Sequence, residues 1–278
     1  MHDRKRSNIE RILILTCLVI FLFSMLQIIK VKIDGYNEEK DFSNLRNQIH
    51  KSGIVQKSEE RQGGSSSKLD QNKSNQNEEV LKSNNEQNKV IYNQVYEENS
   101  DYVGWISIPD TPIDYPVMST PKNPNFYLHR NFSKEYSASG TPFIGDGVSV
   151  DSKSFIIYAH NMKNKTMFVT LEYYKDTEYK NSHKYIYFNT LGENRVYEVI
   201  GAFYEQIDIG NPRYFNYYNY TGDISENDYN ELIRKISDIS IYGEIKDIQK
   251  PEQLIMLSTC SYFAEEGRFV VIAKRIIK

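Results

Sequence analysis

Hydrophobic and polar residues divide the chain into three regions of different pattern. Positions 12–29 contain no charged residue, positions 34–89 are rich in Asn, Gln, Ser, Lys and Glu, and positions 90–278 alternate short apolar runs with turn residues. As a helix the first run would extend over roughly 27 Å, close to the ~30 Å hydrocarbon core of a bilayer. We therefore predict a membrane anchor, a tether and one folded domain.

The charges around the apolar run predict its orientation. Basic residues are more numerous before the run than after it, and such a bias keeps the N-terminus in the cytoplasm. No cleavage site of small residues follows Ile29, which favours an uncleaved signal anchor over a removed signal peptide. Residues 1–33 are thus predicted to be a cytoplasmic tail and single-pass anchor in the cell membrane, with the rest extracellular. The flanking basic residues are Arg4, Lys5, Arg6 and Arg11 before the run, and Lys30 and Lys32 after it.

The polar region 34–89 has few large apolar residues and contains the run Gly63-Gly64-Ser65-Ser66-Ser67. Such a composition cannot bury enough surface to offset the entropy of ordering. We predict a disordered extracellular tether, in which residues 41–49 could form a transient helix. As a flexible coil its reach is on the order of 40 Å.

From Val90 to Lys278 the pattern predicts a mainly β domain. Many short strands separated by turn signals favour a barrel over a wound α/β sheet. A short helix is expected around Val95 and Tyr96, another over 166–174, and a third from Ser225, where Asp228 completes an approximate capping box. The predicted strands are 104–108, 113–118, 141–144, 154–159, 185–188, 195–204, 253–259 and 269–277.

Composition excludes several functions. The formal net charge is −3 and the folded region has no block of Lys and Arg, so we expect no nucleic-acid partner. The five histidines are scattered, and none pairs with Cys or a second His at the spacing of metal ligands. We therefore expect neither a metal nor another cofactor.

Cys260 is the residue with the clearest chemical interest. The chain has two cysteines, and Cys17 lies in the apolar run, so the extracellular part cannot form an internal disulfide. Cys260 ends a predicted strand, and Arg268 opens the next one, where a cation could stabilise a thiolate. A lone Cys is more often a small buried hydrophobe, but the export signal and the polar Ser-Thr pair before it favour a nucleophile.

A cysteine nucleophile needs a proton-transferring partner, usually histidine. His183 has the context of a solvated turn residue, and for His129 a structural hydrogen bond is expected. His160 ends the apolar run that begins at Phe155 and precedes a polar loop, so a rigid strand places its imidazole at an edge. His160 is our candidate acid and base.

These residues resemble a known family. Leu257-Ser258-Thr259-Cys260 with Arg268, and Tyr158-Ala159-His160-Asn161-Met162 upstream, are similar to the signature of sortases, the cysteine transpeptidases of Gram-positive cell envelopes. Within the family, the chain resembles class B most. The similar segments are Gly104-Trp105-Ile106, Tyr115-Pro116-Val117 and Tyr127-Leu128-His129-Arg130, together with the helix-bearing insertion between Tyr204 and Pro251. Met256 stands at the first position of the family's Thr-Leu-x-Thr-Cys pattern, in place of Thr, and no chemistry is expected of that residue.

The resemblance implies an eight-stranded sortase-type β-barrel with an N-terminal helix over residues 90–278. It implies that Cys260 attacks the Thr carbonyl of a C-terminal sorting signal, that His160 serves the leaving and incoming amines, and that Arg268 stabilises the oxyanion. Ser258 and Tyr158 match substrate-contacting positions, and the Tyr-rich stretch 214–220 is expected to shape specificity. The implied partners are secreted proteins with a sorting signal and an amine of peptidoglycan or its lipid-linked precursor.

Three other functions remain open at this point. A thiol hydrolase would resolve the acyl-enzyme with water, and a non-catalytic envelope-binding module would leave the cysteine idle. A pilus-type sortase usually adds an N-terminal lid with an Asp-Pro-aromatic motif and often a C-terminal membrane helix. The tether has no such motif, and no second apolar run follows the last predicted strand, so we rank this alternative lower.

Overall fold

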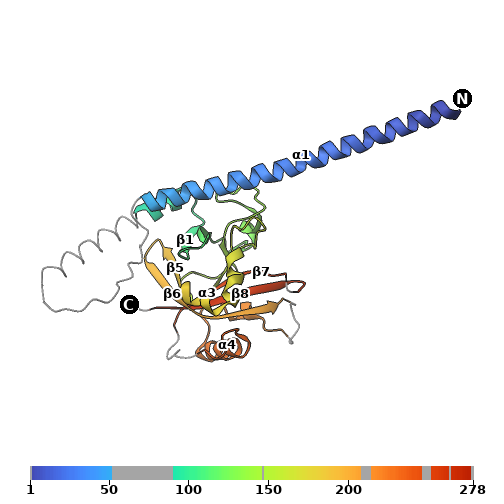
Figure 1. Cartoon of the computed structure of the whole chain (residues 1–278). Coiled ribbons are helices and arrows are strands. Elements are labelled where there is room, and N and C mark those ends of the chain that lie inside the picture. The colour runs from blue at the N-terminus through green and yellow to red at the C-terminus, as the bar shows by residue number, and fades with distance from the viewer. Residues whose placement is uncertain are drawn as a thin grey trace, which may run out of the picture. The chain divides into compact units, whose positions relative to one another are not determined.

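The central feature of the computed structural model is a closed eight-stranded barrel with the strand order β1-β2-β3-β4-β7-β8-β6-β5 (Figure 1). The structure describes residues 2–51, 90–145, 147–207, 214–245, 252–262 and 264–276. Two neighbouring pairs, β2 with β3 and β4 with β7, are parallel, and the other pairs are antiparallel. The mainly β barrel expected from the sequence is confirmed.

The eight strands fall where the alternating pattern predicts them, with shifts of a few residues at their ends. Their bounds are β1 Tyr102–Ser107, β2 Asp114–Met118, β3 Phe143–Ile144, β4 Ser154–Tyr158, β5 Tyr185–Thr190, β6 Asn194–Gln206, β7 Leu254–Cys260 and β8 Gly267–Arg275.

Strand β7 pairs with β4 on one side and with β8 on the other. Its first six residues are buried and only Cys260 is exposed. A strand covered on both faces is expected to be apolar without interruption, and the run Leu254 to Leu257 has that character. The change to Ser, Thr and Cys marks the point where β7 leaves the core.

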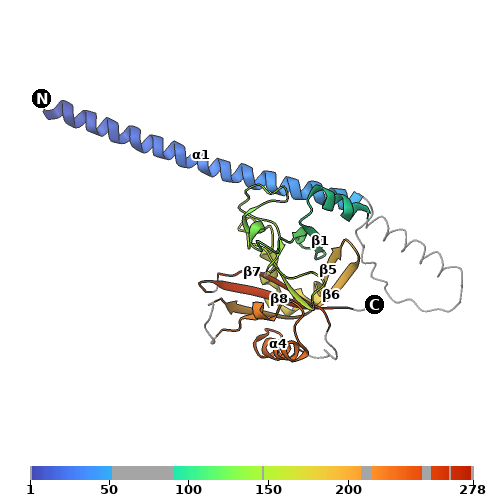
Figure 2. The same ribbon diagram turned by 180° about the vertical axis from the view of Figure 1, so that it is seen from behind.

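Helix α4 (Glu226–Ile239) covers the outer face of β6, β7 and β8. Figures 1 and 2 show it on one side of the barrel in opposite views. Ser225 caps the helix and forms a complete capping box with Asp228, as the sequence predicts. The helix buries one apolar stripe in a cluster that also contains Tyr217 of the 3-10 helix η3 (Tyr217–Tyr220). The stripe consists of Tyr229, Leu232 and Ile236.

The other short helices lie near the ends of the strands. Residues 90–98 are helical, as expected around Val95 and Tyr96. The helix predicted over 166–174 is instead the 3-10 helix η2 (Val169–Lys175), followed by the short α-helix α3 (Thr177–Ser182). Met167, just before η2, has a φ of +57°, so an α-helix cannot begin at the predicted residues. A further 3-10 helix, η1 (Phe126–His129), connects β2 to β3.

Helix α1 (His2–Lys51) contains the predicted anchor. Its stretch from Ile14 has a mean hydropathy of 2.4 over its most apolar window, and the side chains of that window are not buried by protein. By length and composition this helix can cross a membrane.

One prediction about the tether is wrong over part of its length. Residues 34–51 were expected to lie in a disordered tether, but they continue α1, and the compact unit that contains the barrel begins at Asn44. Leu45 and Ile49, one helical turn apart, are buried in a cluster with Tyr92 and Val95. Two apolar residues give too weak a sequence signal, and it is tertiary packing that stabilises the turn. The remainder of the predicted tether, 52–89, lies outside the described residues.

Candidate active site

The ends of β4 and β7 place the predicted site residues at one edge of the barrel. The two strands run parallel with Tyr158 opposite Ser258. Because parallel strands end at the same edge, the residues that follow these positions, His160 on one chain segment and Cys260 on the other, are brought to the same rim. This is the juxtaposition that the sequence predicts.

Two hydrogen bonds join these strand ends. The hydroxyl of Thr259, which is buried, donates to the carbonyl of Ala159 at 2.8 Å. The side-chain amide of Asn161 donates to the carbonyl of Cys260 at 3.0 Å. Thr259 precedes the thiol and Ala159 precedes the imidazole, so the first bond acts as a clamp next to both groups. We call it the Thr259–Ala159 clamp.

Cys260 and Arg268 are directly opposite in the antiparallel pair of β7 and β8. Opposed residues in such a pair lie on the same face with Cβ atoms about 4.5–5.5 Å apart. The thiol is exposed and therefore open to a substrate. The guanidinium donates to the carbonyl of Gly267 at 3.0 Å and to the carboxylate of Glu266 at 3.2 Å. It has five N–H donors, more than these two acceptors use.

The main chain after Cys260 is held by the β7–β8 hairpin. The N–H of Ser261 donates to the carbonyl of Gly267 at 2.9 Å, and its hydroxyl donates to the carboxylate of Glu172 on η2. That N–H is therefore already engaged within the hairpin. The positive donor beside Cys260 in the strand ladder is the side chain of Arg268.

A carboxyl group lies on the other side of Arg268. Glu205 on β6 is the register partner of Arg268, so Cys260, Arg268 and Glu205 form one row across three strands. Burial raises the pKa of the Glu205 carboxyl, while hydrogen bonds from the N–H groups of Gln206 and Phe215 oppose that rise. Through the hydrogen bond from Phe215 to Glu205, this row connects the site to the segment before η3.

The ring of His160 is oriented by η1. Its Nε2 lies 2.8 Å from the carbonyl oxygen of Leu128. A carbonyl can only accept a hydrogen bond, so in the neutral ring Nε2 bears the proton. Nδ1 is then the basic nitrogen, the atom that can exchange a proton with a reacting group.

The environment of His160 disfavours its charged form. Burial is the largest cause that lowers the pKa of His160, and the charges of His129 and Arg268 lower it further. The hydrogen bond to the Leu128 carbonyl opposes this effect. His129 stacks on His160 with ring centroids 5.3 Å apart and an interplanar angle of 28°. A half-buried imidazole with a lowered pKa protonates a leaving group more readily than a free one.

The two predicted substrate-contacting residues, Ser258 and Tyr158, lie two residues before Cys260 and His160 along the chain. Ser258 is buried, and its hydroxyl is 2.8 Å from the hydroxyl of Tyr217. Tyr158 is half-buried and stacks on Phe143 with centroids 5.8 Å apart. Ser258 is therefore covered by η3 in this structure, whereas Tyr158 keeps part of its surface exposed. Their roles in binding remain predictions.

Sequence reasoning missed three residues of the site. His129 was expected to make a structural hydrogen bond, but its ring stacks on His160. Thr259 and Asn161 were noted only as parts of motifs. The sequence does contain one signal, since His129 and His160 both lie in motif pieces similar to class B sortases. Among the described residues, no group of His, Cys, Asp and Glu could hold a metal ion.

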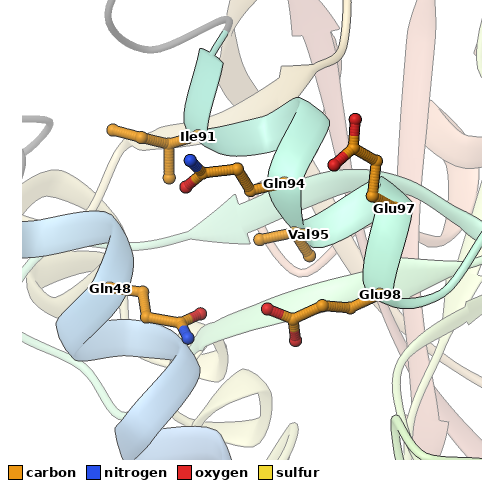
Figure 3. Close-up of a pocket in the computed structure, with 6 residues that line it drawn as sticks. All are labelled: Gln48, Ile91, Gln94, Val95, Glu97 and Glu98. Carbon is orange, nitrogen blue, oxygen red and sulfur yellow. The ribbon is translucent and has the colours of Figure 1, made fainter.

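A separate hollow of about 410 Å³ lies between the end of α1 and the helix 90–98. Figure 3 shows Gln48 from α1 and Glu98 from the second helix reaching into it from opposite sides. Its lining combines two glutamines and two glutamates with Ile91 and Val95, and includes no candidate nucleophile. The hollow shares no residue with the site at the ends of β4 and β7.

Comparisons with known proteins agree with the geometry. A model of the sortase domain matches residues 106–276. The chain is 30% identical over 184 residues to sortase B of Listeria monocytogenes, which covers 65% of this chain and 72% of that protein. Its structure is similar to that of Clostridium perfringens sortase B, with a TM-score of 0.59, 28% identity and coverage of 66% and 99% of the two chains. The fold is also that of a Staphylococcus aureus sortase B–substrate complex, with a TM-score of 0.68, 21% identity and coverage of 88% and 98%.

Proposed function

This chain belongs to the sortase family, within which it is a class B sortase, and on that premise we propose that it cleaves a sorting signal after Thr through a thioacyl-enzyme on Cys260. Sortases are cysteine transpeptidases that attach proteins to the cell wall. The observation that supports the finer proposal is the juxtaposition of Cys260, Arg268 and His160 at one rim of the barrel.

The reaction begins with the proton of the Cys260 thiol held on Nδ1 of His160. In the first half the thiolate of Cys260 attacks the carbonyl carbon of Thr. A tetrahedral oxyanion forms, and Arg268, beside the sulfur, supplies N–H donors and positive charge to it. A donor aimed at a developing oxyanion contributes about 10²- to 10³-fold to the rate. The C–N bond then breaks, and the leaving amine takes a proton from Nδ1 of His160. The product is a thioester between Thr and Cys260.

In the second half an incoming amine attacks the thioester and gives its proton to Nδ1 of His160. The second tetrahedral intermediate releases the thiolate of Cys260 and leaves a new amide bond. His160 therefore returns to its starting charge, and the cycle needs no cofactor. If water replaced the amine, the same residues would catalyse hydrolysis, which is the alternative that the experiment below tests.

We propose that the enzyme acts outside the cell, held by α1 in the membrane. The apolar length of α1 and the flanking basic residues support this orientation. The substrates are secreted proteins with a sorting signal, and the acceptor is an amine of peptidoglycan or of its lipid-linked precursor. Staphylococcus aureus sortase B, which has the same fold, is known as a complex with substrate.

The proposed signals have the form Asn-Pro-x-Thr-Asn or Ser/Asn-Pro-x-Thr-Gly. Proline fixes its own φ and keeps the residue before it extended, which suits a peptide in a groove. A small or short residue after Thr leaves room for the departing amine. The exposed part of Tyr158 and the segment 214–220 are the proposed contacts of the groove.

The test is a competition between these peptides and Leu-Pro-x-Thr-Gly, with the full-length protein in detergent and an amine nucleophile supplied. We expect the Asn or Ser peptides to be cut after Thr and joined to the amine, and Cys260→Ala to do neither. Preference for the Leu peptide would contradict the substrate proposal. Hydrolysis that is unaffected by the amine would favour a thiol hydrolase.

A further inference from the structure

We propose that His129 is a positioning residue that sets the ring orientation and the charge state of His160. The inference rests on the proposed role of His160 as acid and base. His129 itself touches no reacting atom in this scheme. It acts through its neighbour.

The first support is geometric. Helix η1 presents two consecutive residues to one imidazole: the carbonyl of Leu128 binds the edge of the His160 ring at 2.8 Å, and the ring of His129 covers its face at 5.3 Å. The edge contact selects the tautomer, and the face contact limits rotation of the ring out of its plane. Two contacts in different directions hold the ring more firmly than one.

The second support is that His129 is itself held in place. Its carbonyl accepts a hydrogen bond from the N–H of Ser137 at 3.1 Å, and its ring also stacks on Tyr136 with centroids 6.4 Å apart. We call the three stacked rings of Tyr136, His129 and His160 the ring column. The side chains of Tyr136 and His129 are both exposed.

The third support is electrostatic. Two charged groups act on His160, His129 from η1 and Arg268 from β8, and the titratable Cys260 ends β7, the strand that pairs with β4. The charge of Arg268 is permanent, but histidine is the side chain whose charge ordinarily changes between pH 5 and 8. A charge on His129 opposes protonation of His160.

The size of this coupling follows from Coulomb's law. Two unit charges separated by 5.3 Å in a water-like dielectric shift each other's titration by about half a pH unit, and by more where the dielectric is lower. Because a charge on one ring opposes a charge on the other, the wild-type curve of His160 should be broader than that of a single group.

The test uses the full-length protein in detergent with ¹³C-labelled histidine rings, and NMR follows the His160 signal with pH. His129→Phe keeps a ring in the ring column, and His129→Gln keeps a polar side chain, but neither has a charge. We expect the His160 midpoint to rise by up to about half a unit in both variants, and its curve to narrow to that of a single group. The rise should shrink in 1 M salt, where the Debye length falls to about 3 Å.

His183→Phe is the matched control, because His183 stacks on Tyr179 and belongs to another element. It should leave the His160 signal unchanged. Coupling is also reciprocal, so His160→Gln must move the His129 signal by the same amount. An unchanged and equally broad His160 curve in both His129 variants would overturn the inference. So would an equal shift in the His183 control.

Turnover separates this inference from the proposed function. Loss of the ring should lower kcat for peptide cleavage more in His129→Gln than in His129→Phe, with KM unchanged. These NMR titrations need no turnover, so an inactive wild-type protein would count against the proposed function alone. If a variant does not fold, the salt dependence of the wild-type His160 titration curve still tests the inference. A wild-type curve that does not change with salt would contradict the coupling.

Discussion

The Thr259–Ala159 clamp offers a direct test of how the barrel assembles the site. Thr259→Val preserves the branched shape of the side chain and removes only the hydroxyl that reaches the Ala159 carbonyl at 2.8 Å. The site is buried, so water cannot replace the lost donor easily. Leaving a buried polar group without a partner costs about 1–3 kcal/mol. We therefore expect the free energy of unfolding to fall by about 2 kcal/mol.

Urea unfolding followed by tryptophan fluorescence measures this change. Trp105 is the only tryptophan in the sequence, and it is buried in the barrel with its indole N–H bonded to Asp114 at 2.6 Å, so the signal reports the barrel alone. With a slope of about 2 kcal/mol per molar, the urea midpoint should fall by roughly 1 M. The turnover number should also fall, by about tenfold to 10²-fold, because the thiol and the imidazole lose their shared constraint.

Thr120→Val is the control for this substitution. The Thr120 hydroxyl also donates to a carbonyl, that of Asn123 at 2.7 Å, but it is exposed and water can take its place. The same change there should alter the free energy of unfolding by less than about 0.5 kcal/mol. If Thr259→Val matched this control in both stability and turnover, the clamp would have no part in holding the site together.

Three further predictions follow from other parts of the structure. Gly145→Ala places a Cβ 2.3 Å from the ring of Tyr158, so it should displace that ring and raise KM for the sorting peptide. In the control Gly192→Ala the new Cβ has no atom within 4 Å, so KM should not change. Equal KM values for the two variants in peptide cleavage would remove Tyr158 from the groove. Arg268→Lys should recover little of the roughly 10²-fold or greater loss in turnover of Arg268→Ala, because an ammonium cannot reproduce the planar set of donors, and full recovery would mean that charge alone suffices. Protease added to intact, wall-stripped cells should digest the catalytic domain, and protection of the domain would show that the anchor has the opposite orientation.

The strands were predictable because each has a local signature. Short apolar or alternating runs bounded by turn residues mark the strands, and the capping box of Ser225 and Asp228 marks the start of α4. The order of the strands around the barrel has no local signature, since β4 pairs with β7 across about a hundred residues. The η2 region shows the same limit, because its helical type depends on the backbone at Met167 rather than on apolar spacing.

The site was predictable in its members but not in its contacts. Cys260, His160 and Arg268 follow from chemistry and from motif similarity. The clamp from Thr259 follows only from the parallel register of β4 and β7, which brings the residues before the thiol and the imidazole together. The stack of His129 depends on how η1 packs against the end of β4, and a sequence cannot show that placement.

The central claim is that Cys260 forms a thioester with the Thr carbonyl of a sorting peptide. The most direct measurement is mass spectrometry of the full-length protein after brief exposure to an Asn-Pro-x-Thr-Asn peptide without an added amine. We predict a mass increase equal to the peptide fragment ending in Thr, located on Cys260 by proteolytic mapping, released by hydroxylamine, and absent in Cys260→Ala. A wild-type protein that cuts the peptide while no adduct forms on Cys260, or an adduct that persists in Cys260→Ala, would contradict the account.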